Sequence, residues 1–98
     1  MTNTYLVVYD VNTEQVPLGV RTADEVYQAL YDAIKSYGTW AHLTYSCWVI
    51  VSDRTAVEIR DALRSVMRTS DRLAVVQTAH IAAWSNVLCN NEWLQSNL

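Results

Sequence analysis

The chain opens on a continuous run of apolar and aromatic residues that stops at a carboxylate. The run is Tyr5-Leu6-Val7-Val8-Tyr9, and Asp10 follows it directly. A short, unbroken apolar run predicts a buried strand. A charged residue at its end lies at the rim of the sheet, where it is held rigidly and stays in contact with water. Asp10 is therefore the first candidate for chemistry.

A helix is predicted after the polar segment that contains Pro17 and Gly19, which reads as a loop. Thr22 and Glu25 form a capping-box pattern at the start of this helix, and Gly38 supplies a left-handed C-terminal stop. Between these signals the apolar residues recur at helical spacing on a single arc. We expect that arc to pack on a sheet.

Two strands rich in Trp, Val and Ile are predicted next, over 39–43 and 46–52. The two residues between them, Thr44 and Tyr45, match the length of a hairpin turn. The strands are therefore expected to pair in antiparallel fashion.

A second capping-box pattern begins at Thr55 and predicts a helix that continues to Ser70-Asp71. A fourth strand is predicted over 73–78. The last residues, 80–98, form a C-terminal extension, in which Asn90 to Leu94 are expected to open a short helix. The order of elements is strand, helix, strand, strand, helix, strand, with this extension at the end.

That order predicts an α+β fold, a ferredoxin-like βαββαβ two-layer sandwich with an antiparallel sheet. Right-handed connections place both helices on the same face of the sheet. The length of 98 residues fits a single domain, 1–98, with one core. The extension is expected to cover the sheet or to help dimerisation.

The other face of the sheet is left without helices in this arrangement. If Leu6 and Val8 face the helices, then Tyr5, Val7 and Tyr9 face outward, because strand side chains alternate. Trp48 is expected beside them on the hairpin. A monomer rarely leaves such an apolar and aromatic patch in water, so a second copy, the extension or stacked bases should cover it.

The charge balance limits the function classes. A net charge of -3 and a pI near 5.1 argue against binding nucleic acid by bulk electrostatics. Cys47 and Cys89 have no metal-ligand spacing and read as reduced thiols. The sequence has no signal-peptide pattern and no apolar run long enough to span a membrane, so a cytoplasmic location is expected, with no membrane partner.

Five of the seven basic residues nevertheless lie between positions 54 and 72. Arg60, Arg64 and Arg68 repeat at i,i+4 spacing on the predicted second helix, with Arg54 and Arg72 at its ends. Arginine is suited to bidentate phosphate contacts, so Arg54, Arg60, Arg64 and Arg68 are the candidate residues for binding nucleic acid. The alternative is a solvated face that interspersed acidic residues neutralise.

A family resemblance rests on several of these features. The hydrophobic first strand ending in Asp10, the helix closing on Tyr37-Gly38 and Ser46 opening the third strand resemble the small ferredoxin-like subunit of the CRISPR adaptation machinery. The chain is more similar still to the short stand-alone relatives of that subunit, the SinR family. The segments similar to these relatives are Lys35 to Gly38, Trp40 to His42, Val51 to Asp53, Ala56, Glu58 to Asp61 and Ala82 to Trp84.

The resemblance implies a homodimer in which the two copies of Asp10 lie near the dimer axis. Some members of that superfamily place a divalent ion there for phosphodiester hydrolysis. One or two carboxylates with waters and a substrate phosphate are enough to bind Mg²⁺, so Asp10 from each subunit would hold Mg²⁺ or Mn²⁺. His42 is a further catalytic candidate, for acid-base work near the phosphate.

Each of these residues also has a structural interpretation. Asp10 can end the strand by accepting turn hydrogen bonds, and His42 can be a hydrogen-bonded structural residue. Tyr5, Val7, Tyr9 and Trp48 are predicted as a dimer interface, although the aromatic residues among them also suit a core.

The sequence thus predicts a cytoplasmic homodimeric protein that acts as a nucleic-acid-associated or structural accessory protein. The alternative is a divalent-metal-dependent endonuclease that cleaves RNA or DNA. A third possibility, an RNA-recognition motif, lacks its glycine-and-aromatic signature in the predicted strand 46–52.

Overall fold

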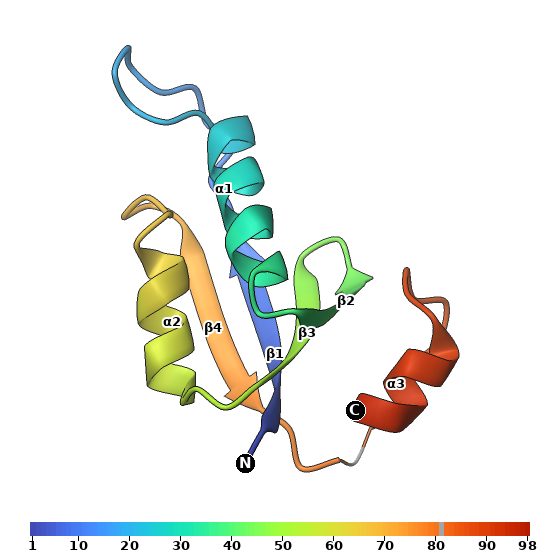
Figure 1. The fold of residues 1–98 in the computed structure, drawn as a ribbon. Coiled ribbons are helices and arrows are strands. Elements are labelled where there is room, and N and C mark those ends of the chain that lie inside the picture. Colours follow the sequence, from blue (N-terminus) through green and yellow to red (C-terminus); the bar gives the residue numbers. More distant parts are fainter. Residues whose placement is uncertain (81) are drawn as a thin grey trace.

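A computed structural model describes residues 1–80 and 82–98 and shows an α+β arrangement (Figure 1). Its helices and strands, in chain order, are β1 (Asn3–Asp10), α1 (Ala23–Lys35), β2 (Thr39–Thr44), β3 (Cys47–Ser52), α2 (Ala56–Arg64), β4 (Arg72–Gln77) and α3 (Asn91–Asn97). The four strands form one sheet in the order β2-β3-β1-β4, and every neighbouring pair is antiparallel. The predicted α+β class with an antiparallel sheet is confirmed.

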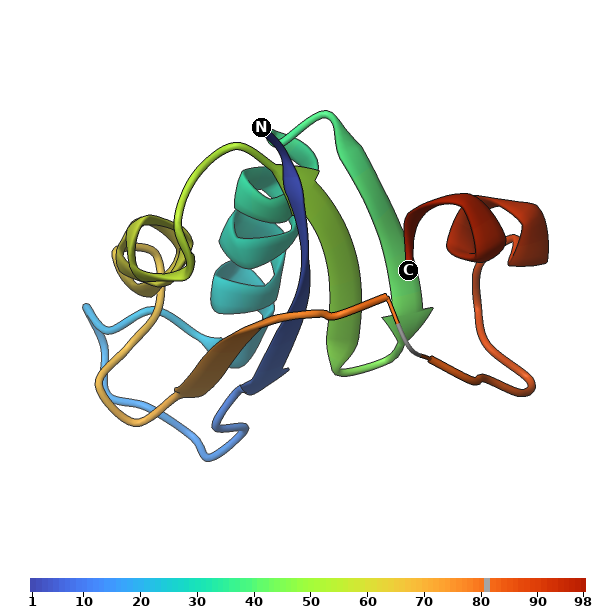
Figure 2. The ribbon, with the colours of Figure 1, turned by 90° about the horizontal axis from the view of Figure 1, so that it is seen from below.

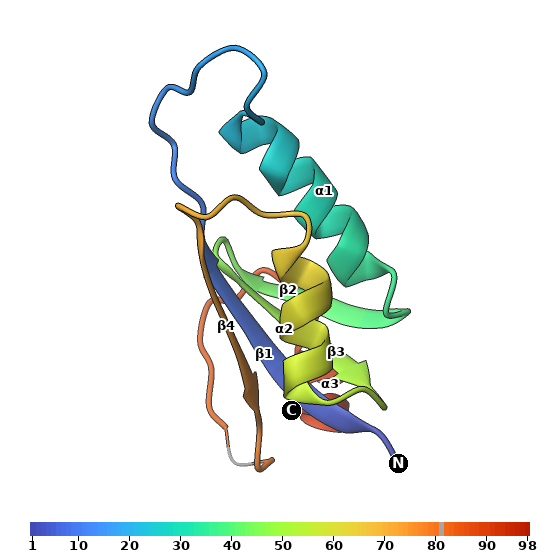
Figure 3. The same ribbon diagram turned by 90° about the vertical axis from the view of Figure 1, so that its left-hand side faces the viewer.

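Helices α1 and α2 lie together on one face of the sheet, and α3 lies on the opposite face (Figure 2). The side view shows α1 and α2 stacked along that face, with the loop between β1 and α1 projecting beyond the end of the sheet (Figure 3). The arrangement is compatible with the predicted two-layer sandwich. None of the helices in the described part of the chain is long and apolar enough to cross a membrane.

Both predicted capping boxes are present. Thr22 caps α1 and Thr55 caps α2, each by accepting from the backbone N–H of a Glu three residues later whose carboxylate accepts from the cap N–H. Each cap satisfies N–H groups that the first helical turn leaves unpaired, a contribution of about 1 kcal/mol. Gly38 follows α1 with a φ of 86°, a backbone conformation that glycine adopts without a steric penalty.

Two boundaries differ from the predicted ones. The hairpin turn is formed by Tyr45 and Ser46 rather than by Thr44 and Tyr45, because a register shift between His42 and Thr44 moves the end of β2 by one residue. Helix α2 ends at Arg64, well before the predicted break at Ser70. Residues 65–71 therefore belong to a loop, in which Val66 and Met67 pack against the core.

The predicted orientation of β1 is wrong. Tyr5, Val7 and Tyr9 are 1%, 0% and 3% exposed, and together with Trp48 they belong to the core cluster that includes residues of α1 and α2. Val8, which was expected to face the helices, is 40% exposed. The four side chains predicted as a dimer interface are thus buried within the chain itself, and no second copy can reach them.

The aromatic residues of the core hold their polar atoms in hydrogen bonds. The Tyr5 hydroxyl donates to the Arg54 carbonyl at 2.7 Å. The Tyr9 hydroxyl donates to the Tyr45 carbonyl at 3.0 Å and accepts from the Trp48 indole N–H at 3.0 Å. Burial raises the pKa of Tyr9 above its ordinary value, so this hydroxyl remains a donor. These bonds explain why the large rings can point inward at low energetic cost.

The outer face of the sheet is divided into a covered and an uncovered half. On the side of β2 and β3, Ala41 and Val49 are buried, and α3 lies over this face with Leu94 fully buried. The Thr4 hydroxyl donates to the Asn97 carbonyl at 2.8 Å and joins α3 to β1. On the side of β1 and β4, in contrast, Val8 and Val76 remain 40% and 51% exposed.

Replacing either of two adjacent residues of β1 with Asp tests this orientation. Val7→Asp puts an unpaired carboxylate into the core, which costs several kcal/mol and should unfold the domain. Val8→Asp, on the outer face, should leave the protein folded at neutral pH. Urea denaturation followed by circular dichroism distinguishes the two variants, and a folded Val7→Asp protein would contradict the assignment.

Candidate functional site

Asp10 lies at the end of β1 with its carboxylate in solvent. Its Oδ2 is 3.2 Å from Nη1 of Arg72 on β4, and the two side chains are 69% and 84% exposed. An ion pair this open contributes about 0–1 kcal/mol, because water and salt screen it. The pair therefore leaves the Asp10 carboxylate accessible to another cation.

A cleft of about 340 Å³ adjoins Asp10 at the start of the loop between β1 and α1. It is lined by Asp10, Val11, Asn12, Thr13, Glu14, Ser70 and Arg72. The Asn12 side chain accepts from the Glu14 backbone N–H at 2.9 Å, which holds this stretch in a turn. Glu14 thus lines the same cleft as Asp10, a placement that the sequence analysis missed.

The signal for Glu14 was available in the sequence. Oxygen-bearing side chains alternate at Asp10, Asn12 and Glu14, but the conformation of the loop decides whether they share a cleft. Carboxylate and amide oxygens suit Mg²⁺. Residues 1–80 and 82–98 contain no group of three or more His, Cys, Asp and Glu side chains that would hold a metal ion. The metal site predicted at Asp10 therefore depends on a second copy.

His42 does not join this cleft. It lies on β2, which β3 separates from β1 in the sheet. Its ring stacks on Trp48 with the ring centroids 4.2 Å apart and the planes 10° from parallel. Its Nε2 is 3.4 Å from the Tyr45 carbonyl. This stacking favours the structural interpretation of His42 over acid-base work beside Asp10.

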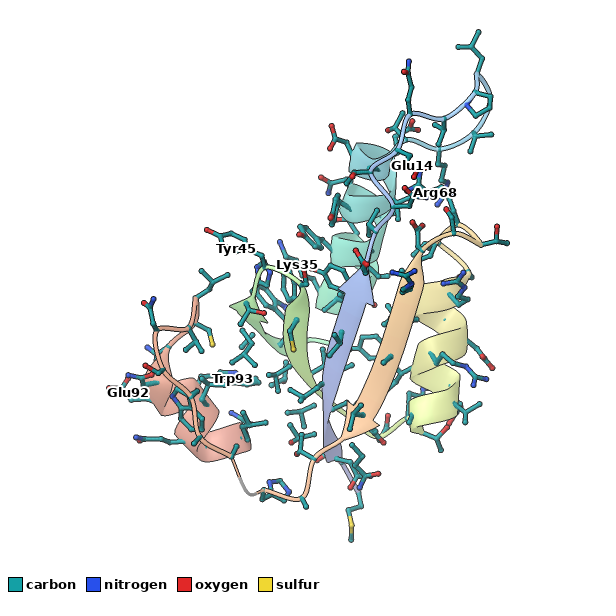
Figure 4. The ribbon with its side chains drawn as sticks, turned by 180° about the vertical axis from the view of Figure 1, so that it is seen from behind. Glu14, Lys35, Tyr45, Arg68, Glu92 and Trp93 are labelled. Atoms are coloured by element: carbon teal, nitrogen blue, oxygen red, sulfur yellow. The ribbon has the colours of Figure 1, made fainter. Side chains whose placement is uncertain are left out.

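Arg68 and Asp71 form a buried ion pair beneath the loop between β1 and α1. The Arg68 side chain is 11% exposed and the Asp71 side chain is fully buried, with Arg68 Nη2 3.0 Å from Asp71 Oδ1. Asp71 also accepts from the Asn12 backbone N–H at 2.9 Å, and Arg68 donates to the carbonyls of Asn12 and Arg21. Figure 4 labels Arg68 and Glu14, which both lie at this end of the molecule. The pair joins both ends of the long loop to the turn before β4.

The hydrogen bonds of Asp71 outweigh the effect of its burial. Burial alone would raise its pKa, but hydrogen bonds from the Arg68 side chain and from the backbone of Arg68 and Asn12 lower the pKa below its usual value. Asp71 is therefore ionised at neutral pH. Since the carboxylate of Asp71 is fully paired, we interpret the pair of Arg68 and Asp71 as a structural one that stabilises the loop between β1 and α1.

The predicted arginine surface is split by the end of α2. Arg64 donates to the carbonyls of Asp71 and Arg68 at 2.6 and 2.7 Å, so it closes the turn that follows the helix. With Arg68 also turned inward, the i,i+4 ridge is not continuous. Arg54 and Arg60 remain exposed and each pairs with an acid, Arg54 with Glu58 at 3.5 Å and Arg60 with Asp61 at 2.9 Å.

The two cysteines are free thiols. Burial raises the pKa of Cys47, and burial likewise raises the pKa of Cys89. Both thiols are thus less nucleophilic at neutral pH than an ordinary cysteine, and neither points to covalent catalysis.

Comparison with known proteins gives no family assignment. No protein-family model, no curated protein and no solved structure matches the chain significantly. The resemblance to the CRISPR adaptation subunit therefore stays a prediction.

Removing the charge of Asp71 tests the buried pair. Asp71→Asn leaves the Arg68 guanidinium without its counter-charge and should lower the free energy of unfolding by about 3–5 kcal/mol at pH 7. Asp61→Asn, which breaks an exposed pair, should change it by less than about 1 kcal/mol. Urea denaturation of both variants measures the difference, and equal losses would contradict the structural role of Asp71.

Acid should affect the same interaction. Because the pKa of Asp71 is lower in the folded protein than in the unfolded chain, its contribution is complete at neutral pH and is lost as the pH falls below about 4. The free energy of unfolding should therefore fall as the pH is lowered from about 5 to about 2. Asp71→Asn should flatten this decline relative to Asp61→Asn, and an unchanged slope would count against the assignment.

Proposed function

We propose that the protein is a homodimeric accessory protein that associates with nucleic acid in the cytoplasm, with a fold of the ferredoxin-like kind. The single observation that carries the proposal is the uncovered half of the outer sheet face, on β1 and β4, which ends at the exposed pair Asp10 and Arg72. This surface offers both an apolar contact area and a charged end. The uncovered face supports the dimer, and the exposed arginines of α2 support the contact with nucleic acid.

The ferredoxin-like assignment is supported by the topology. Read from the other edge, the strand order is β4-β1-β3-β2. The two inner strands, β1 and β3, are those that begin the two strand-helix-strand units of the chain. Both α1 and α2 cover the same face (Figure 2). Right-handed crossovers in a βαββαβ chain produce this combination.

A second copy is the best occupant for the uncovered face. Val8 and Val76 are half exposed on it, and adjacent strands rarely leave apolar residues open without a partner. In a two-fold interface every contact occurs twice, so Arg72 of one subunit can face Asp10 of the partner subunit and the reverse. The Asp10 and Arg72 pair makes the surface complementary to itself in charge.

Contact with nucleic acid would use the arginines of α2 that stay in solvent. Arg54 and Arg60 are exposed, and their pairs with Glu58 and Asp61 are open to competition by phosphate. The guanidinium groups of Arg64 and Arg68 already bind backbone carbonyls, and that of Arg68 also pairs with Asp71. The proposed phosphate-binding surface is therefore narrower than the four arginines that the sequence suggests.

The second candidate function is a divalent-metal-dependent endonuclease. It is favoured by the cleft in which Glu14 lies beside Asp10. Two carboxylates from each subunit, brought together at a dimer axis, would suffice for Mg²⁺ or Mn²⁺ with water and substrate phosphate. Such an ion would polarise the phosphate and activate a water. His42, two strands away, would take no part.

The oligomeric state is tested by the solution mass of the wild type and of Val8→Asp. The wild type should have the mass of a dimer in size-exclusion chromatography with light scattering. Val8→Asp places two like charges in the proposed interface and should be a folded monomer. Val57→Asp, an exposed position on α2, is the matched control and should stay dimeric. A monomeric wild type would refute the proposed dimer.

The nucleic-acid functions are tested with two variants and one control. Arg54→Glu with Arg60→Glu should weaken binding of single- and double-stranded RNA and DNA and should reduce its salt dependence. Asp10→Ala should keep that binding but abolish any cleavage that depends on Mg²⁺ or Mn²⁺. Asp24→Ala, at the exposed start of α1, is the carboxylate control. Cleavage by Asp10→Ala equal to that of the wild type would exclude the endonuclease, and unchanged binding by the double variant would exclude the arginine surface.

A further inference from the structure

The outer edge of β2 has backbone hydrogen-bonding groups that no other strand of residues 1–80 and 82–98 covers. β2 is the last strand of the sheet, with β3 on one side only. An edge strand presents unpaired N–H and C=O groups and can accept a further strand. The groups that point outward follow from the register.

The phase of the hydrogen bonds identifies these groups. The Tyr9 N–H donates to the Ser46 carbonyl, so Ser46, and by alternation Trp48 and Ile50, direct their backbone groups toward β1. Val49 then faces β2 and pairs with Ala41. On β2 the residues on either side, Trp40 and His42, therefore point their N–H and C=O groups away from the sheet.

The chain itself already makes one bond to this edge. The Leu88 N–H donates to the Leu43 carbonyl at 3.0 Å, next to His42. The extension then turns away, because Asn90 caps α3 by accepting from the backbone N–H groups of Glu92 and Trp93. The ladder that Leu88 begins is therefore not continued along Trp40 and His42.

A cleft of about 260 Å³ lies along this part of the edge. It is lined by Trp40, Ala41, His42, Leu88, Cys89, Asn90 and Trp93. Trp93 comes from α3 (Figure 4), so the cleft is bounded by β2 on one side and by the extension on the other. The ammonium of Lys35 lies 5.3 Å from the centroid of the Trp40 ring and helps to hold that ring in place.

The chemistry of the cleft favours a polypeptide. Its volume is below the roughly 300–1,000 Å³ of typical small-molecule sites. None of the lining residues is Lys or Arg, so a phosphate backbone would find no permanent counter-charge among them. Backbone donors and acceptors spaced along a strand, beside an apolar hollow, match what an extended peptide offers.

We propose that this cleft binds an extended segment of a partner protein, which adds to the sheet as a fifth strand on the outer edge of β2. The backbone of the segment pairs with Trp40 and His42. One apolar side chain of the segment enters the cleft between Trp40 and Trp93. The site is separate from the outer face of β1 and β4 and from the arginines of α2, so it stands or falls independently of the proposed dimer and nucleic-acid contacts.

Two substitutions at His42 isolate the contribution of its backbone N–H to peptide binding. His42→Ala removes the imidazole and keeps the N–H, whereas His42→Pro removes both. Proline is tolerated on an edge strand where the N–H faces outward, so both variants are expected to fold. Circular dichroism and urea denaturation verify this before binding is measured.

The probe is a library of random twelve-residue peptides displayed on phage, selected against the purified full-length protein. Selected peptides, made with a fluorescent label, should bind the wild type and His42→Ala with similar Kd values. His42→Pro should bind them about five-fold more weakly or worse, the effect of losing one backbone hydrogen bond. Trp93→Ala should also weaken binding, because it opens the apolar hollow.

A second test lies in the peptide and does not depend on how the variants fold. N-methylation of alternate amides should abolish binding at the positions that face β2 and should leave it intact at the positions between them. Equal effects at both sets of positions would overturn the proposal. So would a library without any selected binder, equal binding by His42→Pro and His42→Ala, or displacement of the peptides by oligo(dT) or oligo(U), which would assign the cleft to nucleic acid instead.

Discussion

The inward packing of the aromatic side chains of β1 is the constraint on which the rest of the structure depends. Tyr5, Val7 and Tyr9 fill the space between the sheet and the helices α1 and α2. Because the side chains of a strand alternate, this choice sends Leu6 and Val8 to the outer face. A shift of one residue would exchange the two faces completely. The hydroxyl groups of Tyr5 and Tyr9 donate hydrogen bonds to backbone carbonyls, so both side chains can be buried without an unpaired polar atom.

A second constraint is the buried pair of Arg68 and Asp71. It holds the two ends of the loop between β1 and α1, at Asn12 and Arg21, against the turn that precedes β4. Asp10 stands at the start of that loop. The same contacts fix Asn12, from which the turn to Glu14 begins, and remove Arg68 from the surface.

The sequence predicts the elements well because their signals are local. Thr22 and Thr55 are the N-caps of α1 and α2, and Asn90 is the N-cap of α3, as expected from the sequence. The orientation of β1 was not predictable in the same way. A strand that is apolar at every position has no alternation to show which face is buried, and the choice depends on the volume available beneath α1 and α2.

The prediction of a continuous arginine ridge on the second helix was wrong for a related reason. The i,i+4 spacing places Arg60, Arg64 and Arg68 on one ridge only while the helix continues, and α2 ends at Arg64. After that point Arg68 is free to turn inward toward Asp71, a contact that only the tertiary structure reveals. Asp10, in contrast, lies where the sequence placed it, at the exposed end of a central strand, because the end of an apolar run is itself a local signal.

The orientation of β1 decides which of its side chains lie in the core and which lie on the outer face of β1 and β4. Native-state thiol labelling tests this division most directly. In a background with Cys47 and Cys89 replaced by Ser, single Val7→Cys and Val8→Cys proteins are treated with a maleimide in native buffer and analysed by mass spectrometry. The structure predicts labelling at position 8 of the folded protein, at a rate set by dissociation of the proposed dimer, and none at position 7 until the protein unfolds. Rapid labelling at position 7 with protection at position 8 would contradict the account.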